Sequence, residues 1–241
     1  MARRRHYTRF KFEGTFTRGY DVFNHVATLG LDLFWRRKAA EQVSRDLNGT
    51  ACPGAVLDLA CGTGDMAAAV ARAHPGVQVV GSDPSAAMLH YGREKFETWN
   101  GRIAVVQAVS LLPFPDGVFS AITCAFGVRN FVALADDLQE SLRLLRPGGR
   151  LNVLEFFIPG NLLIKAVLKS YNALLFPFLG FLLTGRVGPY RYLFNSIFTF
   201  RTVPDFCTLL EGAGFRDIRI RSFFFRDGPS GERRQAAVTG Q

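Results

Sequence analysis

Residues 55–65 read Ala-Val-Leu-Asp-Leu-Ala-Cys-Gly-Thr-Gly-Asp, an apolar run that passes into a turn with two glycines. A strand, a glycine turn and a helix start form the layout of a nucleotide-type cofactor site, because glycine lets the backbone turn tightly and approach a ligand. Nineteen residues after Gly64, Asp83 ends a second predicted strand. A carboxylate there can accept hydrogen bonds from both hydroxyls of a ribose. The stretch predicts a cofactor site that includes Asp58, Gly62, Gly64 and Asp83.

Two acidic residues beside this turn indicate which cofactor it holds. Asp58 lies four residues before Gly62, and Asp65 directly follows Gly64. Carboxylates would repel the pyrophosphate of a dinucleotide, whereas S-adenosylmethionine has no phosphate and carries a cationic sulfonium and a cationic ammonium. A phosphate-binding P-loop is excluded because no Gly-Lys-Ser/Thr follows. The residues favour S-adenosylmethionine over a dinucleotide and over a glycine-rich turn with incidental acids.

Strand-like and helix-like segments alternate through the middle of the chain. Five short apolar runs predict buried strands: Ala55–Ala60, Val77–Gly81, Ile103–Gln107, Phe119–Ala125 and Leu151–Phe157. Before the fifth run, leucines recur at helical spacing up to a breaker cluster at 146–149. A helix at Val203–Gly214 and a strand at Ile218–Phe225 follow. This alternation predicts an α/β fold with a mostly parallel sheet covered by helices on both faces.

We expect two parts in the chain. Residues 1–50 form an N-terminal helical segment, and residues 51–241 form the cofactor-binding domain. Residues 160–200 are rich in Leu, Phe and Tyr and are interrupted by Pro and Gly. This stretch predicts short helices inserted after the fifth strand.

The charge of the chain is unevenly distributed. Of the net charge of +9 over 241 residues, residues 1–40 carry +6, residues 41–158 carry −3 and residues 159–241 carry +6. The longest apolar run, Ala173–Leu183, is too short for a membrane-spanning helix, which needs about 20 residues. The four cysteines are scattered, so neither a disulfide scaffold nor a metal site is expected, which suits a reducing cytoplasm. The basic flanks alone suit nucleic acid or an anionic membrane equally well.

Several motifs together resemble the ubiquinone/menaquinone biosynthesis C-methyltransferase family. They are Tyr20-Asp-Val-Phe-Asn24, Leu29-Gly30 through Trp35-Arg-Arg37, Asp58 through Asp65, Leu112-Pro-Phe-Pro-Asp116, Phe126-Gly-Val-Arg-Asn130, Arg146-Pro-Gly-Gly149 with Leu154-Glu-Phe156, Tyr190-Arg-Tyr-Leu193 with Ser196-Ile197, and Gly214-Phe215. The glycine turn is shared by many class I methyltransferases, whereas the first and fifth of these motifs together are much more specific. The resemblance covers most of residues 18–215.

The resemblance implies a class I methyltransferase fold with a Rossmann-like seven-stranded sheet. The implied reaction is transfer of a methyl group from S-adenosylmethionine to a ring carbon of a polyprenylated hydroquinone, of the demethylmenaquinol or the 2-methoxy-6-polyprenyl-benzoquinol type. By position, the implied cofactor contacts are Thr63, Asp83, Ala108 and Val109, and the residues implied to act at the substrate are Tyr20, Arg129 and Asn130. The chain departs from the family pattern with Ala108 in place of Asp or Asn, Ser110 in place of Glu, Ala125 in place of Ser and Asp32 in place of His.

Carbon methylation needs an electron-rich ring, which a hydroquinone provides when one hydroxyl ionises. Arg129 stays protonated in a protein, so we expect it to stabilise the phenolate or to orient a water rather than act as the base. The alternative for Arg129 is a structural ion pair with a nearby acid. Tyr20 and Asn130 could hydrogen-bond the ring oxygens, and His25 and Asp32 are candidate proton acceptors.

The 160–200 insert lies where this fold builds a lid over its substrate. Its aromatic residues and a neighbour could line an isoprenoid channel or form an ordinary helical core: Phe157, Tyr171, Phe176, Phe178, Phe181 and Phe194. A substrate with a long tail resides in the bilayer, so we expect a cytoplasmic protein held peripherally at the inner face of an anionic membrane, without nucleic acid, and a homodimer stays open. The alternatives are methylation of another lipid or small apolar metabolite, methylation of RNA, and a catalytically inactive binding protein.

Overall fold

The structure is a computed structural model that describes residues 15–48, 54–108, 111–158, 195–223 and 235–240, with isolated positions between 162 and 181. For residues 15–20 and 235–240 it describes the backbone alone. Within these ranges, no helix is long and apolar enough to cross a membrane.

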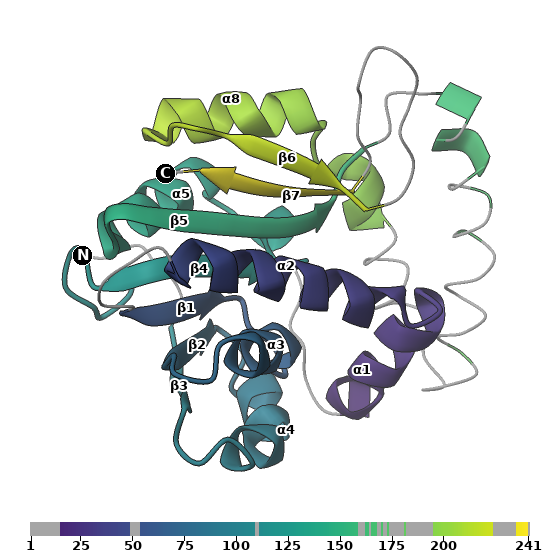
Figure 1. The fold of residues 1–241 in the computed structure, drawn as a ribbon. Helices are drawn as coiled ribbons and strands as arrows, with labels where there is room; N and C mark the ends of the chain where they lie inside the picture. Colours follow the sequence, from purple (N-terminus) through teal and green to yellow (C-terminus); the bar gives the residue numbers. More distant parts are fainter. Residues whose placement is uncertain are drawn as a thin grey trace, which may run out of the picture.

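A single sheet of seven strands forms the centre of the molecule, in the order β3-β2-β1-β4-β5-β7-β6 (Figure 1). The strands are β1 Ala55–Leu59, β2 Val79–Asp83, β3 Ile103–Gln107, β4 Phe119–Ala125, β5 Leu145–Phe156, β6 Arg219–Ser222 and β7 Gln235–Gly240. Strands β1 to β5 pair in parallel, and β7 runs antiparallel to both of its neighbours. The predicted α/β class and mostly parallel sheet are confirmed.

Two strands, β2 and β5, start two or more residues away from the predicted position. Strand β2 begins two residues later than expected and ends at Asp83. Strand β5 begins at Leu145, because the breaker cluster at 146–149 forms an irregularity within the strand rather than a loop before it. Leu145 pairs with Phe119 and Arg150 pairs with Ala121, so the intervening residues are accommodated by a shift of register.

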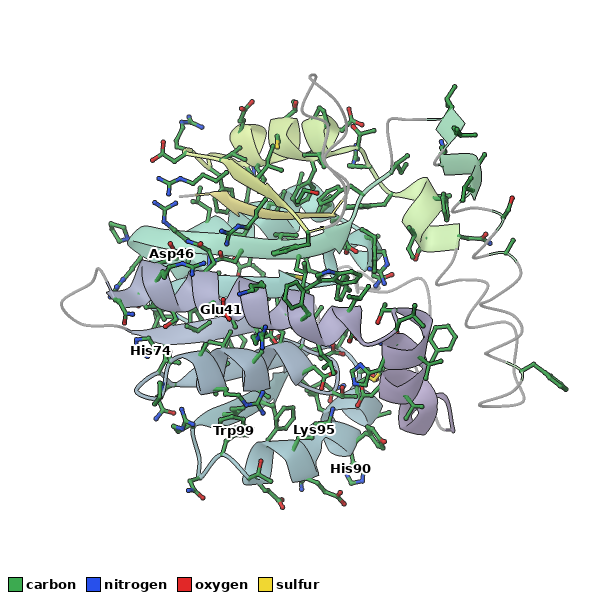
Figure 2. The ribbon with its side chains drawn as sticks, turned by 45° about the vertical axis from the view of Figure 1, so that its right-hand side comes forward. Glu41, Asp46, His74, His90, Lys95 and Trp99 are labelled. Atoms are coloured by element: carbon green, nitrogen blue, oxygen red, sulfur yellow. The ribbon has the colours of Figure 1, made fainter. Side chains whose placement is uncertain are left out.

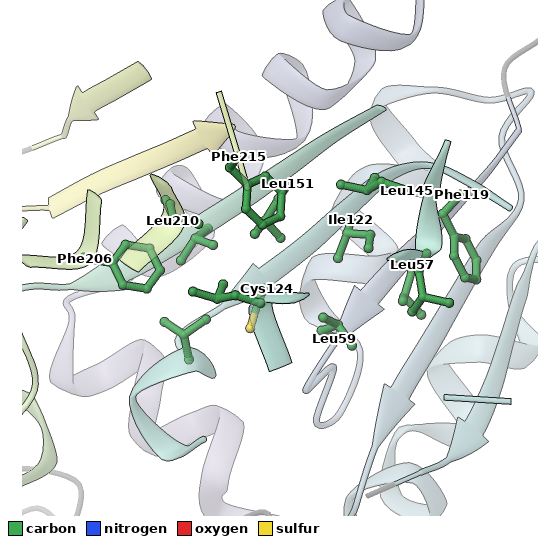
Figure 3. Close-up of a cluster of buried hydrophobic side chains, with 14 of the residues drawn as sticks. Leu57, Leu59, Phe119, Ile122, Cys124, Leu145, Leu151, Phe206, Leu210 and Phe215 are labelled. Carbon is green, nitrogen blue, oxygen red and sulfur yellow. The ribbon is translucent and has the colours of Figure 1, made fainter. Parts of the chain in front are cut away.

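Helices cover both faces of the sheet, as the alternation predicted. They are α1 Thr15–Ala27, α2 Leu31–Asn48, α3 Asp65–Ala73, α4 Ala86–Glu97, the short 3-10 helix η1 Val128–Asn130, α5 Leu134–Leu144 and α8 Val203–Ala213. Strand side chains alternate between the faces, so Val56 joins the core under α2 and α3, and Leu57 joins the core under α5 and α8 (Figure 3). Figure 1 shows α1 beyond the edge at which the parallel strands end.

The predicted insert falls largely outside the described residues, and with it Tyr171, Phe176, Phe178 and Phe194. Phe157 is buried in the core, with its ring 5.4 Å from that of Phe206. Phe181 is exposed. Phe157 therefore fits the core alternative.

Candidate active site

A cavity of about 490 Å³ lies at the carboxyl ends of the parallel strands. Its position follows from the topology, because β1 and β4 are neighbours in the sheet but not in the chain, and ligands of such sheets bind where the strand order reverses. Among the predicted site residues, the cavity is lined by Gly62, Thr63, Asp83 and Asn130. Asp58, Gly64, Ala108 and Arg129 are described but lie outside this lining, and Val109 lies outside the described residues.

The two glycines of the turn after β1, Gly62 and Gly64, have different structural roles. Both have left-handed backbones, with φ of +55° at Gly62 and +87° at Gly64. A Cβ on Gly62 would meet nothing within 4 Å, whereas a Cβ on Gly64 would lie 2.0 Å from the Phe96 ring. Gly62 thus leaves space in the cavity wall, and Gly64 lets α3 start close against α4.

Asp83 is held in the cavity wall by backbone groups. Its Oδ2 accepts a hydrogen bond from Gly62 N at 2.9 Å, and its Oδ1 accepts one from Ser85 N at 2.8 Å. Burial raises the pKa of Asp83, and these two N–H donors oppose the rise. Because a carboxylate has about four acceptor positions, Asp83 can still accept hydrogen bonds from ribose hydroxyls.

Asp58, which the sequence placed in the cofactor site, lies beneath the turn with no exposed surface. Thr123 Oγ1 donates to Asp58 Oδ1 at 2.7 Å across the β1–β4 pair. Burial raises the pKa of Asp58 to about 7, against the opposing effect of the Thr123 hydrogen bond. Any influence of Asp58 on a ligand in the cavity is therefore electrostatic rather than a direct contact.

Thr63 connects the turn to the N-terminal helices. Its Oγ1 donates to Asp21 Oδ1 of α1 at 2.6 Å. Lys95 of α4 then donates to Asp21 Oδ2 at 2.7 Å and to Asp65 Oδ1 at 2.8 Å, which joins α1, α3 and α4 (Figure 2). Asp21 and Asp65 both line the cavity, so the part of it beside Thr63 carries two carboxylates.

Arg129 and Asn130 lie on η1 and face different spaces. Asn130 lines the main cavity, while Arg129 lines a second cavity of about 40 Å³. Arg129 Nη1 lies 2.5 Å from Glu155 Oε1, and both side chains are buried. Arg129 Nε also donates to Ser196 Oγ at 3.2 Å. The ion pair that the sequence left as the alternative for Arg129 is present, and its role at a substrate stays a prediction.

The candidate proton acceptors His25 and Asp32 form a pair. His25 Nδ1 lies 2.9 Å from Asp32 Oδ2, and Asp32 Oδ1 accepts from Thr28 Oγ1 at 2.8 Å. These two residues and Asp65 place potential metal ligands within 4.8 Å of one another. Lys95 already neutralises Asp65, so we interpret the cluster as an anchor for the α1–α2 turn.

One departure from the family pattern, Ala125, lies in the wall of the same cavity. Ala125 lines it and contributes only a methyl group, and Ala108 lies outside the lining. Gln107, which was not predicted, lines the cavity and donates from Nε2 to Pro84 O at 3.0 Å. Tyr20 belongs to α1, but the structure describes only its backbone. Ser110 lies outside the described residues.

Arg36 of α2 is another cavity residue that the sequence did not predict. It is only 9% exposed, and it lines both cavities together with Phe126. A signal was present, because Arg36 falls on the helix face that also carries the buried Trp35 and Ala39. An arginine on an apolar helix face needs a counter-charge or a ligand.

The donor set fits the cofactor that the acidic turn predicted. Three carboxylates, Asp21, Asp65 and Asp83, line the cavity, and Arg36 is the only Lys or Arg among its described lining residues. This balance suits a ligand with cationic centres and one carboxylate, and it does not suit a pyrophosphate.

Comparison with known proteins agrees with this geometry. The sequence model of the ubiE/COQ5 methyltransferase family matches residues 9–226. A demethylmenaquinone methyltransferase of Thermus thermophilus is 42% identical over 197 residues, covering 81% of this chain and 87% of the relative. A ubiquinone/menaquinone biosynthesis C-methyltransferase of Geobacter sulfurreducens is 39% identical over 210 residues, covering 86% and 80%.

Solved structures share the fold at low sequence identity. A SAM-dependent methyltransferase from Thermotoga maritima superposes with a TM-score of 0.59 at 16% identity, covering 94% of this chain and 97% of that one. Another, from Aquifex aeolicus, gives 0.51 at 16% identity, covering 78% and 80%. The likeness extends to the fold alone.

Proposed function

The chain belongs to the ubiE/COQ5 methyltransferase family, and we propose that it methylates a ring carbon of a polyprenylated hydroquinone in respiratory quinone biosynthesis. The protein is a methyltransferase of the class I fold, and membership of this family implies the use of S-adenosylmethionine. The observation that carries the proposal is the cavity at the carboxyl ends of β1 and β4, with its three carboxylates and one arginine.

We assign the cofactor to this cavity. Asp83 accepts hydrogen bonds from the ribose hydroxyls, and Gly62 and Thr63 of the turn after β1 form part of the wall that contacts the ligand. When bound, S-adenosylmethionine supplies an electrophilic methyl group. Asp58 adds negative potential beneath the turn in the fraction of molecules in which it is ionised.

The acceptor ring is assigned to the side of the cavity formed by Phe126 and η1. Asn130 lines the main cavity there and can hydrogen-bond a ring oxygen. Arg129 is fixed by Glu155 behind Phe126, so its charge stabilises a phenolate rather than accepting its proton. His25, which is paired with Asp32, is proposed to take up the proton. Tyr20 stays a predicted partner of the ring oxygens.

We also propose peripheral association with the inner face of an anionic membrane. Five large apolar side chains are exposed around the α1–α2 turn: Val22, Val26, Leu29, Leu33 and Phe34. Arg37 and Lys38 lie beside them, with their charged groups 5.5 and 5.8 Å from the Phe34 ring. Apolar side chains rimmed by basic ones suit an anionic interface. The homodimer stays a prediction.

The test of the proposed function is methyl transfer from labelled S-adenosylmethionine to alternative acceptors. A demethylmenaquinol and a 2-methoxy-6-polyprenyl-benzoquinol are offered as reduced and as oxidised forms, with RNA as a further acceptor. We expect label on a ring carbon of one reduced quinol and none on the oxidised form, because the quinone ring lacks the nucleophilic carbon. Label in RNA alone, or no transfer to either quinol, would contradict the proposal.

A further inference from the structure

Arg36 is placed where a buried guanidinium meets the cofactor cavity. It lies on α2, lines the same cavity as Thr63, and is only 9% exposed. Its Cζ lies 5.0 Å from the centre of the Phe126 ring. Taking an arginine out of water is unfavourable unless an anion with good geometry compensates it.

Among the described residues, the acids near Arg36 make their short contacts with other groups. Its Nε is buried without a hydrogen-bond partner in the described part of the chain. The carboxylate recorded beside it, Asp32 Oδ2, is 3.8 Å away and already accepts a hydrogen bond from His25. Asp65 accepts its short hydrogen bond from Lys95 instead. The guanidinium therefore keeps unused donor capacity beside the cavity that it lines.

We propose that Arg36 binds the α-carboxylate of the methionine portion of the cofactor, an assignment that rests on the proposed function. An amino acid carries a carboxylate and an ammonium on the same carbon. Arg36 is the cation and Asp21 and Asp65 are the anions of the same end of the cavity, so the three side chains complement both charges. Arg36 thus fixes one end of the ligand and Asp83 fixes the other.

The experiment compares two ligands that differ in the amino-acid portion. S-adenosylhomocysteine carries the carboxylate and the ammonium, and 5′-methylthioadenosine keeps the adenosine and the sulfur but lacks both. Dissociation constants are measured by calorimetry on the full chain. We expect Arg36→Gln to weaken S-adenosylhomocysteine binding about 10- to 100-fold, the scale of a lost charge-assisted hydrogen bond, and to change methylthioadenosine binding less than about threefold.

Arg37→Gln is the matched control. Arg37 is the next residue of α2, its side chain is 65% exposed, and it does not line the main cavity. We expect Arg37→Gln to leave both dissociation constants unchanged. Arg36→Lys keeps the charge but loses the forked geometry, so it should retain part of the preference for S-adenosylhomocysteine. It also serves as the test variant if Arg36→Gln does not fold.

Two results would overturn the assignment. Unchanged binding of S-adenosylhomocysteine by Arg36→Gln would show that another group holds the carboxylate. Equal weakening of both ligands would show that Arg36 supports the fold of the cavity rather than the amino-acid end. Failure of the unaltered protein to bind either ligand would instead contradict the proposed function, so the two proposals fail in different ways.

Discussion

Two cavities share Phe126 and Arg36, yet they differ in size and in construction. The cofactor cavity has a volume of about 490 Å³, and the cavity beside Arg129 has about 40 Å³. In the first, Asp83 is held by backbone N–H groups two and twenty-one residues away. In the second, Arg129 is held by the side chain of Glu155 on β5. The cavity assigned to the cofactor is large and its Asp83 is held by backbone N–H groups, whereas the cavity beside Arg129 is small and its arginine is held by an acidic side chain.

This difference has a physical consequence. Backbone donors at strand ends persist as long as the sheet does, so the cofactor side tolerates changes in its side chains. A buried ion pair depends on both partners, since removal of one leaves an unpaired charge in the interior. We therefore expect loss of a charged side chain beside Arg129 to act mainly on stability, and loss of one in the cavity assigned to the cofactor to act mainly on binding.

The largest effect is expected from Glu155→Gln. The amide leaves the buried Arg129 guanidinium without its counter-charge, so the free energy of unfolding should fall by about 3–5 kcal/mol in urea titrations. Asp116→Asn is the control, because Asp116 is 79% exposed in its pair with Arg143, and we expect a loss below about 1 kcal/mol. Similar losses in both variants would remove the distinction between the buried pair and an exposed one.

Gly64→Ala and Gly62→Ala compare two positions of the cofactor turn. At Gly64 the methyl group meets Phe96 and the backbone is left-handed, so we expect unfolding to become easier by about 2–4 kcal/mol. At Gly62 only the backbone strain applies, about 1–2 kcal/mol, but the methyl group enters the cavity wall. Thermal melts with and without S-adenosylhomocysteine should show lost ligand stabilisation in Gly62→Ala. Equal behaviour of the two variants would contradict the separate roles.

The sequence predicted Gly62, Thr63 and Asp83 for one site and they line one cavity, whereas it left the partner of Arg129 open. Asp83 and Gly62 lie at strand ends, whose positions follow from apolar runs and turn residues. The spacing of Asp58 from Gly62 does not tell which way its side chain points. The side chain is fully buried and bonded to Thr123, and its role at the cofactor stays a prediction. The Arg129–Glu155 partnership joins residues 26 positions apart, and no local pattern encodes it.

Asp83→Asn should weaken the ribose end of the site. The amide keeps one acceptor oxygen and loses the charge, so we expect binding of S-adenosylhomocysteine to fall by about 1.5–3 kcal/mol, roughly 10- to 100-fold. Because methylthioadenosine keeps the ribose, its affinity should fall equally, in contrast to the Arg36→Gln expectation. A loss confined to S-adenosylhomocysteine would place Asp83 at the amino-acid end.

Asp58 gives the smallest effect, and it appears as a dependence on pH. Its pKa is about 7 in the folded protein and near 3.8 without burial, so between these values the folded state binds more protons than the unfolded state. The stabilisation that comes from the proton bound to Asp58 is complete below pH 3.8 and is lost as the pH rises through about 7. From pH 5 to pH 6 the free energy of unfolding should therefore fall by about 1 kcal/mol more in the parent than in Asp58→Asn, which has no titrating carboxyl there. Urea titrations at the two pH values measure the difference, and equal slopes would mean that Asp58 is ionised throughout beneath the cofactor turn.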